Sequence, residues 1–451
     1  MNRHTFAAIG AALGIGFVAA SATATLPLVG TNLSGAEWNV NTGGVTRGGY
    51  HVYPDSHYVP GYTSPATFAA AGMSVFRFPI DWENVQPALN GAFDPTELQK
   101  VQTTVADLTA LGVTVIIDLH NYARYDGNTV GSAQVPNAAF ADFWSRMAQA
   151  YANDPLVGFD LMNEPHDLPT EQWAGAANAA IAAIRATGAK NRIFVEGNGW
   201  TGAQTWTSNW YGTPDSTVML TITDPADNYV FEAHQYLDPD STGGSDTCAS
   251  STIGSERVQP FTDWLRQNGK RGYLGEFNGG ANATCYAALT DLLDYLDANA
   301  DVYVGWTFWA SGPEWGSSSR VLEPGRDDYG PYMQVLQPHL WTSGPPPVNE
   351  GDAATGTGSG ASSDAGSSRG DAAGEGDAGI TPDGESDASE GSSGSDAGTR
   401  PYVGSDSDAP SSSSASSGCS VARGKGEGLE GYGLVAAAAA LLAPRRRRPR
   451  G

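Results

Sequence analysis

The nine residues FDLMNEPHD, at positions 159–167, carry the feature on which the fold prediction rests. The first four are mostly apolar, which predicts a buried strand, but the strand runs directly into Asn163, Glu164 and Pro165. Asn, Asp and Pro often close a strand into a simple turn, and the stretch alone is compatible with that interpretation. The rest of the chain decides whether the amide and the carboxylate open into a pocket instead.

Apolar runs of strand length recur on both sides of this stretch. They occupy residues 26–33, 74–80, 113–120, 157–163, 192–198, 228–236, 271–277 and 302–309. Amphipathic segments of helix length lie between most of them, at 95–111, 137–152, 170–187, 256–267 and 285–299. Nearly continuous apolar strands that alternate with helices indicate parallel strands covered by helices. The pattern predicts an α/β fold, a (β/α)8 TIM barrel, with a doubly wound open sheet as the alternative.

Nearly every predicted strand finishes in a side chain capable of chemistry. These side chains are Arg77, His120, Asn163, Glu164, His234, Tyr236, Glu276 and Trp309. The carboxyl ends of barrel strands open on one face, where barrel enzymes have their active sites. We therefore expect these residues to converge on one pocket, into which Asn163 and Glu164 open.

Two glutamates facing each other across a pocket with aromatic side chains indicate glycoside hydrolysis. One carboxyl group must be protonated to donate to the leaving oxygen, and the other must be ionised to attack the anomeric carbon. Arg77 and the Tyr236 hydroxyl are expected near Glu276, where they favour its ionised form. The other expected contacts are Asn163 to a sugar 2-hydroxyl, and Trp200 and Trp309 to the faces of sugar rings.

Metal and cofactor chemistry find no support in the motifs. The chain has 7 histidines, but no HExxH, no Cys/His spacing of zinc type and no GxxxxGK(S/T). We expect no metal and no cofactor. His120 and His234 are expected to bind sugar hydroxyls or carboxylates, or else to be satisfied histidines that line strand ends.

The net charge of the chain limits the classes of molecule that it can bind. The chain has 451 residues and a net charge of -25 at pH 7. No basic field exists to attract phosphate, so nucleic acid is excluded, whereas an acidic surface suits a neutral substrate.

The two ends of the chain differ from its central segment. Residues 1–24 contain a basic start, an apolar stretch and small residues for cleavage, which predicts a signal peptide, with a membrane anchor as the alternative. Residues 344–417 are rich in Gly, Ser and Asp and predict a disordered acidic linker. Residues 418–451 combine Cys419, a short apolar stretch and an arginine block, which suggests a sorting tail in transient contact with a membrane. The catalytic domain is then residues 25–343, secreted or attached to the cell surface.

Cys248 and Cys285 lie in surroundings rich in Ser and Gly. In an exported chain they either form a disulfide or remain two free surface thiols.

Six segments, in this order along the chain, resemble glycoside hydrolase family 5, and within it the endo-β-1,4-glucanases. They are GTNLSGAEW (30–38), FRFP (76–79), IIDLHNYARY (116–125), LMNEPHDL (161–168), EAHQYLDPDSTG (232–243) and WLRQNGKRGYLGEF (264–277). The end of the chain resembles the Myxococcus-type C-terminal sorting tail, in which a Gly-Cys pair precedes an apolar segment and terminal arginines.

The resemblance implies roles for particular residues. Glu164 is implied to be the acid/base and Glu276 the nucleophile of a retaining double displacement. Substrate contacts are implied at Arg77, His120, Asn163, His234, Tyr236 and Trp309, and a disulfide beside the cleft between Cys248 and Cys285.

The expected function is that of a secreted, monomeric endo-β-1,4-glucanase, acting on cellulose or mixed-linkage β-glucan. The alternatives are another β-glycanase on the same barrel, such as a mannanase or xyloglucanase, and a non-catalytic carbohydrate-binding surface protein.

Overall fold

The computed structural model describes residues 26–37, 65–152, 154–312 and 320–342. The chain divides into two compact units, and all of these residues belong to the first, Met1–Ala354 with Glu430–Gly451. The expected signal peptide, acidic linker and sorting tail lie outside the described residues. No helix within the described ranges is both long enough and apolar enough to cross a membrane.

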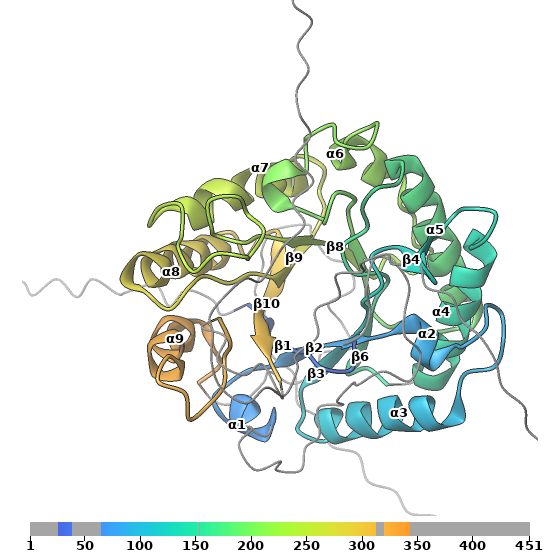
Figure 1. Ribbon diagram of the computed structural model, residues 1–451, viewed down its shortest axis with the longest axis horizontal. Coiled ribbons are helices and arrows are strands. Elements are labelled where there is room, and N and C mark those ends of the chain that lie inside the picture. Colours follow the sequence, from blue (N-terminus) through green and yellow to red (C-terminus); the bar gives the residue numbers. More distant parts are fainter. Residues whose placement is uncertain (1–25, 38–64, 153, 313–319, 343–451) are drawn as a thin grey trace, which may run out of the picture. The chain divides into compact units, whose positions relative to one another are not determined.

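Eight parallel strands of the described part close into a barrel (Figure 1). They are β1 (Leu28–Leu33), β2 (Val75–Ile80), β3 (Thr114–Leu119), β6 (Val157–Asp160), β7 (Ile193–Glu196), β8 (Tyr229–His234), β9 (Gly272–Glu276) and β10 (Tyr303–Ser311). Each strand pairs with the next one in this order, and β1 pairs in parallel with β10. This last pairing closes the sheet, so the TIM barrel is confirmed and the open sheet is wrong.

Helices surround the strands, as Figure 1 shows. The long ones are α3 (Pro95–Thr109), α4 (Asn137–Tyr151), α5 (Thr170–Ala186), α7 (Ile253–Gln267) and α8 (Ala283–Ala298). Two of them begin at a strong capping residue: the Asp94 side chain accepts from the N–H groups of Thr96 and Glu97, and that of Asn282 from Cys285. All five expected helices are therefore present, with ends shifted by a few residues.

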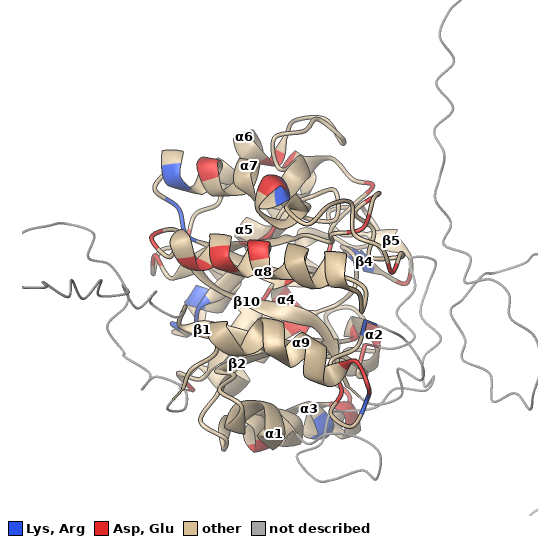
Figure 2. Ribbon diagram, turned by 90° about the vertical axis from the view of Figure 1, so that its left-hand side faces the viewer, with Lys and Arg blue, Asp and Glu red and all other residues tan. Residues whose placement is uncertain are grey.

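Shorter elements fill the connections. They are α1 (Pro65–Ala70), α2 (Trp82–Val85), α6 (Asp215–Val218), α9 (Tyr329–Leu336), the hairpin of β4 (Arg124–Tyr125) with β5 (Asn128–Thr129), and the 3-10 turns Ala203–Thr205, Met219–Thr221 and Gln337–His339. The long connection from β7 to β8 holds α6 and two of these turns. Acidic residues recur along α8, which contains no Lys or Arg, whereas α7 carries both acidic and basic residues (Figure 2).

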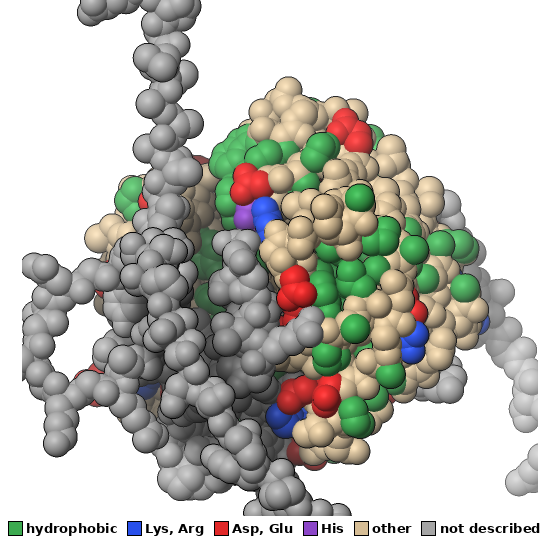
Figure 3. All heavy atoms as spheres, turned by 45° about the vertical axis from the view of Figure 1, so that its right-hand side comes forward, with side chains coloured by type: hydrophobic (Ala, Val, Ile, Leu, Met, Phe, Trp, Pro, Cys, Tyr) green, Lys and Arg blue, Asp and Glu red, His purple; other side chains and the backbone are tan. Residues whose placement is uncertain are grey.

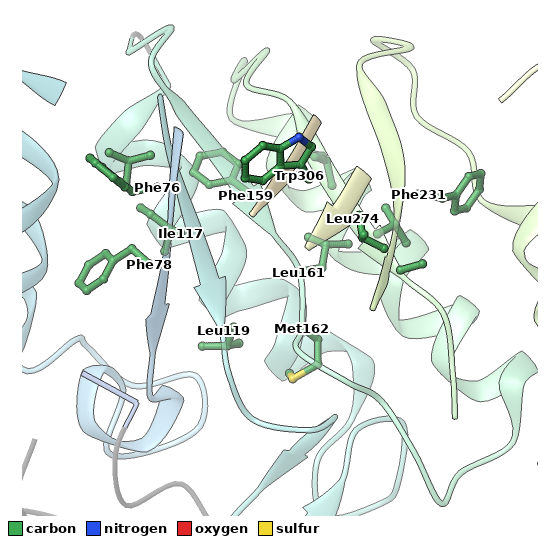
Figure 4. Packing of buried hydrophobic residues seen from close by; sticks show 14 of the residues in the cluster. Phe76, Phe78, Ile117, Leu119, Phe159, Leu161, Met162, Phe231, Leu274 and Trp306 are labelled. Atoms are coloured by element: carbon green, nitrogen blue, oxygen red, sulfur yellow. The ribbon is translucent and has the colours of Figure 1, made fainter. Parts of the chain in front are cut away.

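Side chains point alternately to the two faces of the barrel strands, so the hydrophobic core has two parts. Phe76, Phe78, Ile117 and Leu119 belong to the large hydrophobic cluster that fills the space between strands and helices, and Figure 4 shows Phe76 and Phe78 on the same side of β2. A second, separate cluster contains Val75, Ile116, Phe194, Val230, Tyr273 and Val304, each from a different strand. Because side chains alternate along a strand, this second cluster lies inside the barrel.

The next inward position on these strands is charged. Arg77, Asp118, Glu196 and Glu232 each follow a residue of the inner cluster by two positions, and Asp160 follows Gly158 in the same way. All five are fully buried. We call them the charged layer. It lies nearer the carboxyl ends of the strands than the apolar cluster, and therefore directly below the mouth of the barrel.

Candidate active site at the mouth of the barrel

Glu164, His234 and Glu276 meet at the carboxyl ends of β6, β8 and β9. One ligand-type atom from each of the three lies within 4.8 Å of the other two. His234 Nδ1 is 2.9 Å from Oε1 of Glu164 and 3.6 Å from Oε2 of Glu276. The two glutamates that follow different strands in the sequence therefore share one histidine.

The backbone around Glu164 differs from the sequence prediction. Strand β6 ends at Asp160, so the expected strand through Asn163 is too long. The backbone still hydrogen-bonds to both neighbouring strands beyond it, since the Leu161 N–H donates to the Phe194 carbonyl at 3.2 Å and the Asn163 N–H to the Leu119 carbonyl at 3.0 Å. Glu164 then has a φ of 45°, a left-handed conformation that non-glycine residues seldom adopt. The Glu164 N–H donates to Oε2 of Glu196 at 2.6 Å. Such backbone strain persists only where surrounding contacts enforce it, and it occurs often at functional sites.

Glu276 is held by two donors. Arg77 Nη1 donates to its Oε1 at 2.9 Å, and the Tyr236 hydroxyl donates to its Oε2 at 2.5 Å. Both hydrogen bonds fix the orientation of the carboxylate, whose oxygens act as acceptors. Burial, followed by the charge of Glu276, raises the pKa of Tyr236 well above its usual range, so the hydroxyl keeps its proton and remains a donor.

Glu164 has a different environment. Burial raises the pKa of its carboxyl group, the hydrogen bond with His234 acts in the opposite direction, and the charge of Glu276 raises it further. Its side chain is 16% exposed, against 4% for Glu276. The two carboxyl groups are therefore differentiated: one tends to keep a proton and faces the mouth, while the other is held as an acceptor.

Asn163 connects this pair to a substrate position. Its Oδ1 accepts from Arg77 Nη2 at 2.9 Å. Its buried Nδ2 has no hydrogen-bond partner among the residues the structure describes. A buried N–H without a partner is costly unless a ligand satisfies it, so this amide is suited to donate to a sugar hydroxyl.

His120 and Trp309 stack at the same mouth. Their rings lie 5.4 Å apart with an angle of 13° between their planes. His120 Nδ1 lies 2.7 Å from Asp118 Oδ2, and its Nε2 lies 3.4 Å from the hydroxyl of Tyr122. Burial lowers the pKa of His120, but the charge and hydrogen bond of Asp118 outweigh it and the net shift is upward.

Trp200 lies beside the acid/base candidate. Its ring stacks on His166 at 4.4 Å and 11°, and it contacts Trp210 edge-on at 6.1 Å and Tyr211 at 6.3 Å. Trp200 is 38% exposed and Trp210 55%. Because His166 follows Glu164 by two residues, this aromatic group forms a platform next to the expected proton donor.

The charged layer supports both glutamates from below. Arg77 lies between 2.8 and 3.2 Å from carboxylate oxygens of Asp118, Asp160, Glu196 and Glu232, in addition to Glu276. One guanidinium therefore faces five carboxyl groups without access to water, so protonation of some of them must supply the balance. Burial raises the pKa of Glu196 to about 7. Burial, followed by the charge of Glu232, raises the pKa of Asp160 well above its usual range.

Two groups of side chains in the described part have the geometry for a metal ion: Glu164, His234 and Glu276, and Glu196, Glu232 and His234. Motif spacing could not reveal either one, since the members of each group come from more than one strand region. Arg77 lies within 3.2 Å of three of these carboxylates and supplies positive charge between them. The guanidinium group of Arg77 therefore balances the negative charge of these carboxylates in the place of a metal ion.

All the site residues expected from the sequence lie at the mouth or directly below it. The sequence interpretation missed Glu196, Glu232, Tyr122, Trp210 and the two aspartates of the charged layer. Glu196 and Glu232 could have been found from the two-residue alternation of RIFVE and YVFEAH, in which the carboxylate follows an inward apolar residue. For Tyr122 and Trp210, which lie in loops, no periodic signal exists.

Cys248 and Cys285 form a disulfide with an S–S distance of 1.99 Å and a Cα–Cα distance of 5.2 Å. The bond joins the connection after β8 to the first turn of α8. It packs against Gly279, where a Cβ atom would come within 2.9 Å of Cys248 Sγ. The alternative of two free thiols is wrong for this structure.

Comparison with known proteins gives one consistent result. The sequence profile of the cellulase family, glycosyl hydrolase family 5, matches residues 41–312. Endo-β-1,4-glucanase A of Emericella nidulans is 41% identical over 315 residues, which are 69% of this chain and 92% of that protein. Endo-β-1,4-glucanase B of Aspergillus niger is 39% identical over 313 residues, 69% of this chain and 89% of that protein.

Solved structures resemble the chain to a similar degree. XacCel5A in complex with cellopentaose is 41% identical with a TM-score of 0.65, over 70% of this chain and 99% of that one. The endo-β-1,4-glucanase Xac0029 of Xanthomonas axonopodis pv. citri is 44% identical with a TM-score of 0.65, over 70% of this chain and 98% of that one.

Proposed function

The chain belongs to the cellulase family, glycosyl hydrolase family 5, and we propose that it is an endo-β-1,4-glucanase that acts by retaining double displacement. Glu276 is the proposed nucleophile and Glu164 the proposed acid/base. The relatives named above as endo-β-1,4-glucanases support the activity, and the geometry at the barrel mouth supports the assignment of roles.

The short distance between the two carboxylates is the main support for a retaining mechanism. Glu164 and Glu276 bring oxygen atoms within 4.8 Å of each other around His234. Retaining enzymes have carboxyl groups about 5–5.5 Å apart, whereas inverting enzymes need about 6.5–9.5 Å to admit a water molecule between base and sugar. The short separation leaves room for the sugar but none for an intervening water.

The first step forms a covalent intermediate. An oxygen of the Glu276 carboxylate attacks the anomeric carbon, the bond from that carbon to the leaving oxygen breaks, and the proton of Glu164 passes to the leaving oxygen. Arg77 and Tyr236 hold the attacking carboxylate in place. The new Glu164 carboxylate lies 2.9 Å from His234 Nδ1, which stabilises the charge it has gained.

The second step regenerates the enzyme. The Glu164 carboxylate takes a proton from water while the water oxygen attacks the anomeric carbon and the ester bond to Glu276 breaks. Two inversions at one carbon leave the β configuration unchanged. Glu164 ends the cycle protonated and Glu276 ionised, as they began.

A neutral polysaccharide fits the surface of the site. Trp200, Trp210 and Trp309 offer aromatic faces, and Asn163 offers an N–H that has no partner within the described ranges. On the face shown in Figure 3, acidic and basic side chains are sparse among hydrophobic and neutral polar ones. These features support cellulose or mixed-linkage β-glucan as substrate, since sugar rings bind through stacking and hydroxyl hydrogen bonds.

A polysaccharide panel tests the activity. Reducing ends and viscosity would be followed on carboxymethyl cellulose, barley β-glucan, xyloglucan and mannan, with Glu276→Gln as the blank. Viscosity should fall ahead of sugar release on the first two. Activity only on mannan or xyloglucan would mean that this polysaccharide is the substrate in place of cellulose or β-glucan. Binding without sugar release would favour a carbohydrate-binding protein. Proton NMR of the first product should show the β-anomer, and an initial α-anomer would refute retention.

We also infer that the protein is exported as a monomer. The signal-peptide pattern of residues 1–24 and the Cys248–Cys285 disulfide support export, because disulfides persist in oxidising compartments. The C-terminal tail supports passage through a sorting step at the membrane. A secreted or surface-attached chain whose first residue is Thr25 is the expected result of N-terminal sequencing, and an intact Met1 on the cytoplasmic chain would contradict export.

A further inference from the structure

Glu196 contacts the acid/base candidate in two ways. Its Oε2 accepts the Glu164 backbone N–H at 2.6 Å. Its Oε1 lies 3.2 Å from His234 Nε2, and the other ring nitrogen of the same histidine lies 2.9 Å from Oε1 of Glu164. Glu196, His234 and Glu164 therefore form a closed chain of contacts that returns to Glu164 through its own peptide group.

The position of Glu196 is fixed by its surroundings. It ends β7 and is fully buried. Arg77 Nη2 donates to its Oε1 at 3.0 Å, and Trp173 Nε1 of helix α5 donates to its backbone carbonyl at 2.8 Å. A carboxylate held in place by a neighbouring strand and a packed helix can in turn fix the position of the loop that contains Glu164.

His234 is surrounded by acidic groups from each neighbouring element. Glu164 follows β6, Glu196 is on β7, Glu232 is on its own strand with an oxygen 3.7 Å from Nε2, and Glu276 is on β9. Burial lowers the pKa of His234, but the charge of Glu196, followed by that of Glu276, outweighs it and the pKa rises well above its usual range.

The groups that face Glu196 are equally well defined. They are Arg77 from β2, Asp160 from β6, and Glu232 and His234 from β8. Burial raises the pKa of Glu196 to about 7, against the lowering effect of His234. Glu196 is therefore largely protonated in acid, and its negative charge develops only as the pH passes neutrality.

We propose that Glu196 is the positioning residue of the acid/base: one carboxyl oxygen fixes the peptide of Glu164, and the other keeps the proton on the histidine that faces the Glu164 side chain. The proposal rests on the proposed function of Glu164. Glu196 is fully buried and acts through Glu164 and His234, with which it is in contact. A purely structural role as a partner of Arg77 would leave the charge state of His234 unaffected. The proposed role predicts that Glu196 controls that charge state.

Glu196→Gln tests this directly. If the glutamine oxygen accepts from the Glu164 N–H, its amide N–H2 group faces the donors of Arg77 and His234. His234 can relieve this conflict only by losing its Nε2 proton and accepting instead. The substitution should therefore favour neutral His234 while changing little volume.

The primary measurement is the titration of His234 by nitrogen NMR of the full chain labelled at histidine. The signal of His234 is assigned by its absence in His234→Asn. In the wild type the ring should stay doubly protonated at pH 7.5, and in Glu196→Gln it should lose its proton at least about one pH unit lower. Asp160→Asn is the matched control, since it removes a buried carboxylate bonded to Arg77 that makes no described contact with His234. Its His234 titration should stay as in the wild type.

The second measurement is the pH dependence of kcat/KM on β-glucan. A neutral His234 no longer lowers the pKa of Glu164, so the alkaline limb should move to higher pH in Glu196→Gln. The acidic limb of the pH profile should stay at the same pH in the variant, because Glu196 is protonated in that pH range in the wild type as well. The fall in kcat should reach about tenfold or more on glucan and be smaller on an aryl glycoside with a good leaving group, which needs little acid assistance.

Two results would overturn the proposal. One is an unchanged His234 titration in a folded Glu196→Gln variant, which would leave Glu196 a structural partner of Arg77. The other, which needs no variant of Glu196, is a neutral His234 in the wild type at pH 7.5. Because NMR reports on His234 without turnover, a chain without glucanase activity would refute the proposed function separately.

Discussion

Arg77 Nη1 lies 2.9 Å from Oε1 of Glu276, although the two residues are on β2 and β9, which are not neighbours in the barrel. The contact crosses the barrel interior and joins the charged layer to the proposed nucleophile. It fixes the carboxylate that must attack, while Glu164 receives its contacts from His234 and Glu196. This difference in partners leads to different predictions for the two glutamates.

Glu276→Gln should reduce turnover by about four orders of magnitude or more, since the amide cannot attack the anomeric carbon. The change preserves volume, so the circular dichroism spectrum should match that of the wild type. Glu256→Gln makes the same chemical change at an exposed position of α7 and should leave activity as it is. Activity near the wild-type level in Glu276→Gln would show that another group is the nucleophile.

Glu164→Gln should lower kcat on unactivated β-glucan by about 10²–10⁴-fold, because protonation of the leaving oxygen is lost. On an aryl cellobioside with a good leaving group, the first step should be affected much less. Burial raises the pKa of Glu164, so the wild type loses its acid form as the pH rises through that pKa. The alkaline limb of the pH profile should therefore disappear in the variant. Equal losses on both substrates, with the limb retained, would contradict the assignment.

Asp215→Asn should change how stability depends on pH. Asp215 is buried at the start of α6 and accepts the Asn198 N–H at 2.9 Å. Burial raises its pKa from 3.8 to about 7, with the hydrogen bond from Asn198 acting in the opposite direction. Its contribution to stability is thus complete below pH 3.8 and is lost as the pH rises through 7.

The free energy of unfolding of Asp215→Asn should therefore rise relative to the wild type between about pH 4 and 7, by at most about 4 kcal/mol. Urea unfolding at several pH values measures this difference. Asp301→Asn, at an exposed aspartate whose hydrogen bond with Arg266 lowers its pKa, serves as control and should not reproduce the upward trend. A difference that does not depend on pH would mean that Asp215 titrates normally.

Removing the disulfide should destabilise the chain without removing activity. The Cys248–Cys285 bond spans a sequence separation of 37 residues, for which loop-closure entropy predicts a loss of about 3–4 kcal/mol. Replacing both cysteines by serine should lower the melting temperature, and reductant should lower that of the wild type but not that of the variant. A variant that melts at the wild-type temperature would mean that the bond adds no stability. Loss of turnover at 25 °C in a folded variant would mean that the bond also shapes the loop after Glu276.

The strands and helices could be predicted from the sequence because their signals are local. Runs such as SVFRFPI and VTVIIDLH bury both faces of a strand, and the helical segments between them carry one apolar face. The polar residue at the end of each run was equally visible, which is why Glu164, His234 and Glu276 could be expected together. The end of β6 was misplaced by three residues, since the apolar pair Leu161 and Met162 continues the apolar pattern past Asp160, the last residue of the strand.

The sequence alone thus determined the alternation of strands and helices and the residues offered at each strand end, because both follow from the short-range periods of the backbone. Only the tertiary structure decided which of these residues touch. Closure of β1 on β10 and the registers of the parallel strands place Glu196 against Glu164 and His234, and Arg77 against Glu276 across 199 residues of chain. Contacts across a closed barrel depend on the relative heights and tilt of separate strands, and no local pattern in the sequence encodes them.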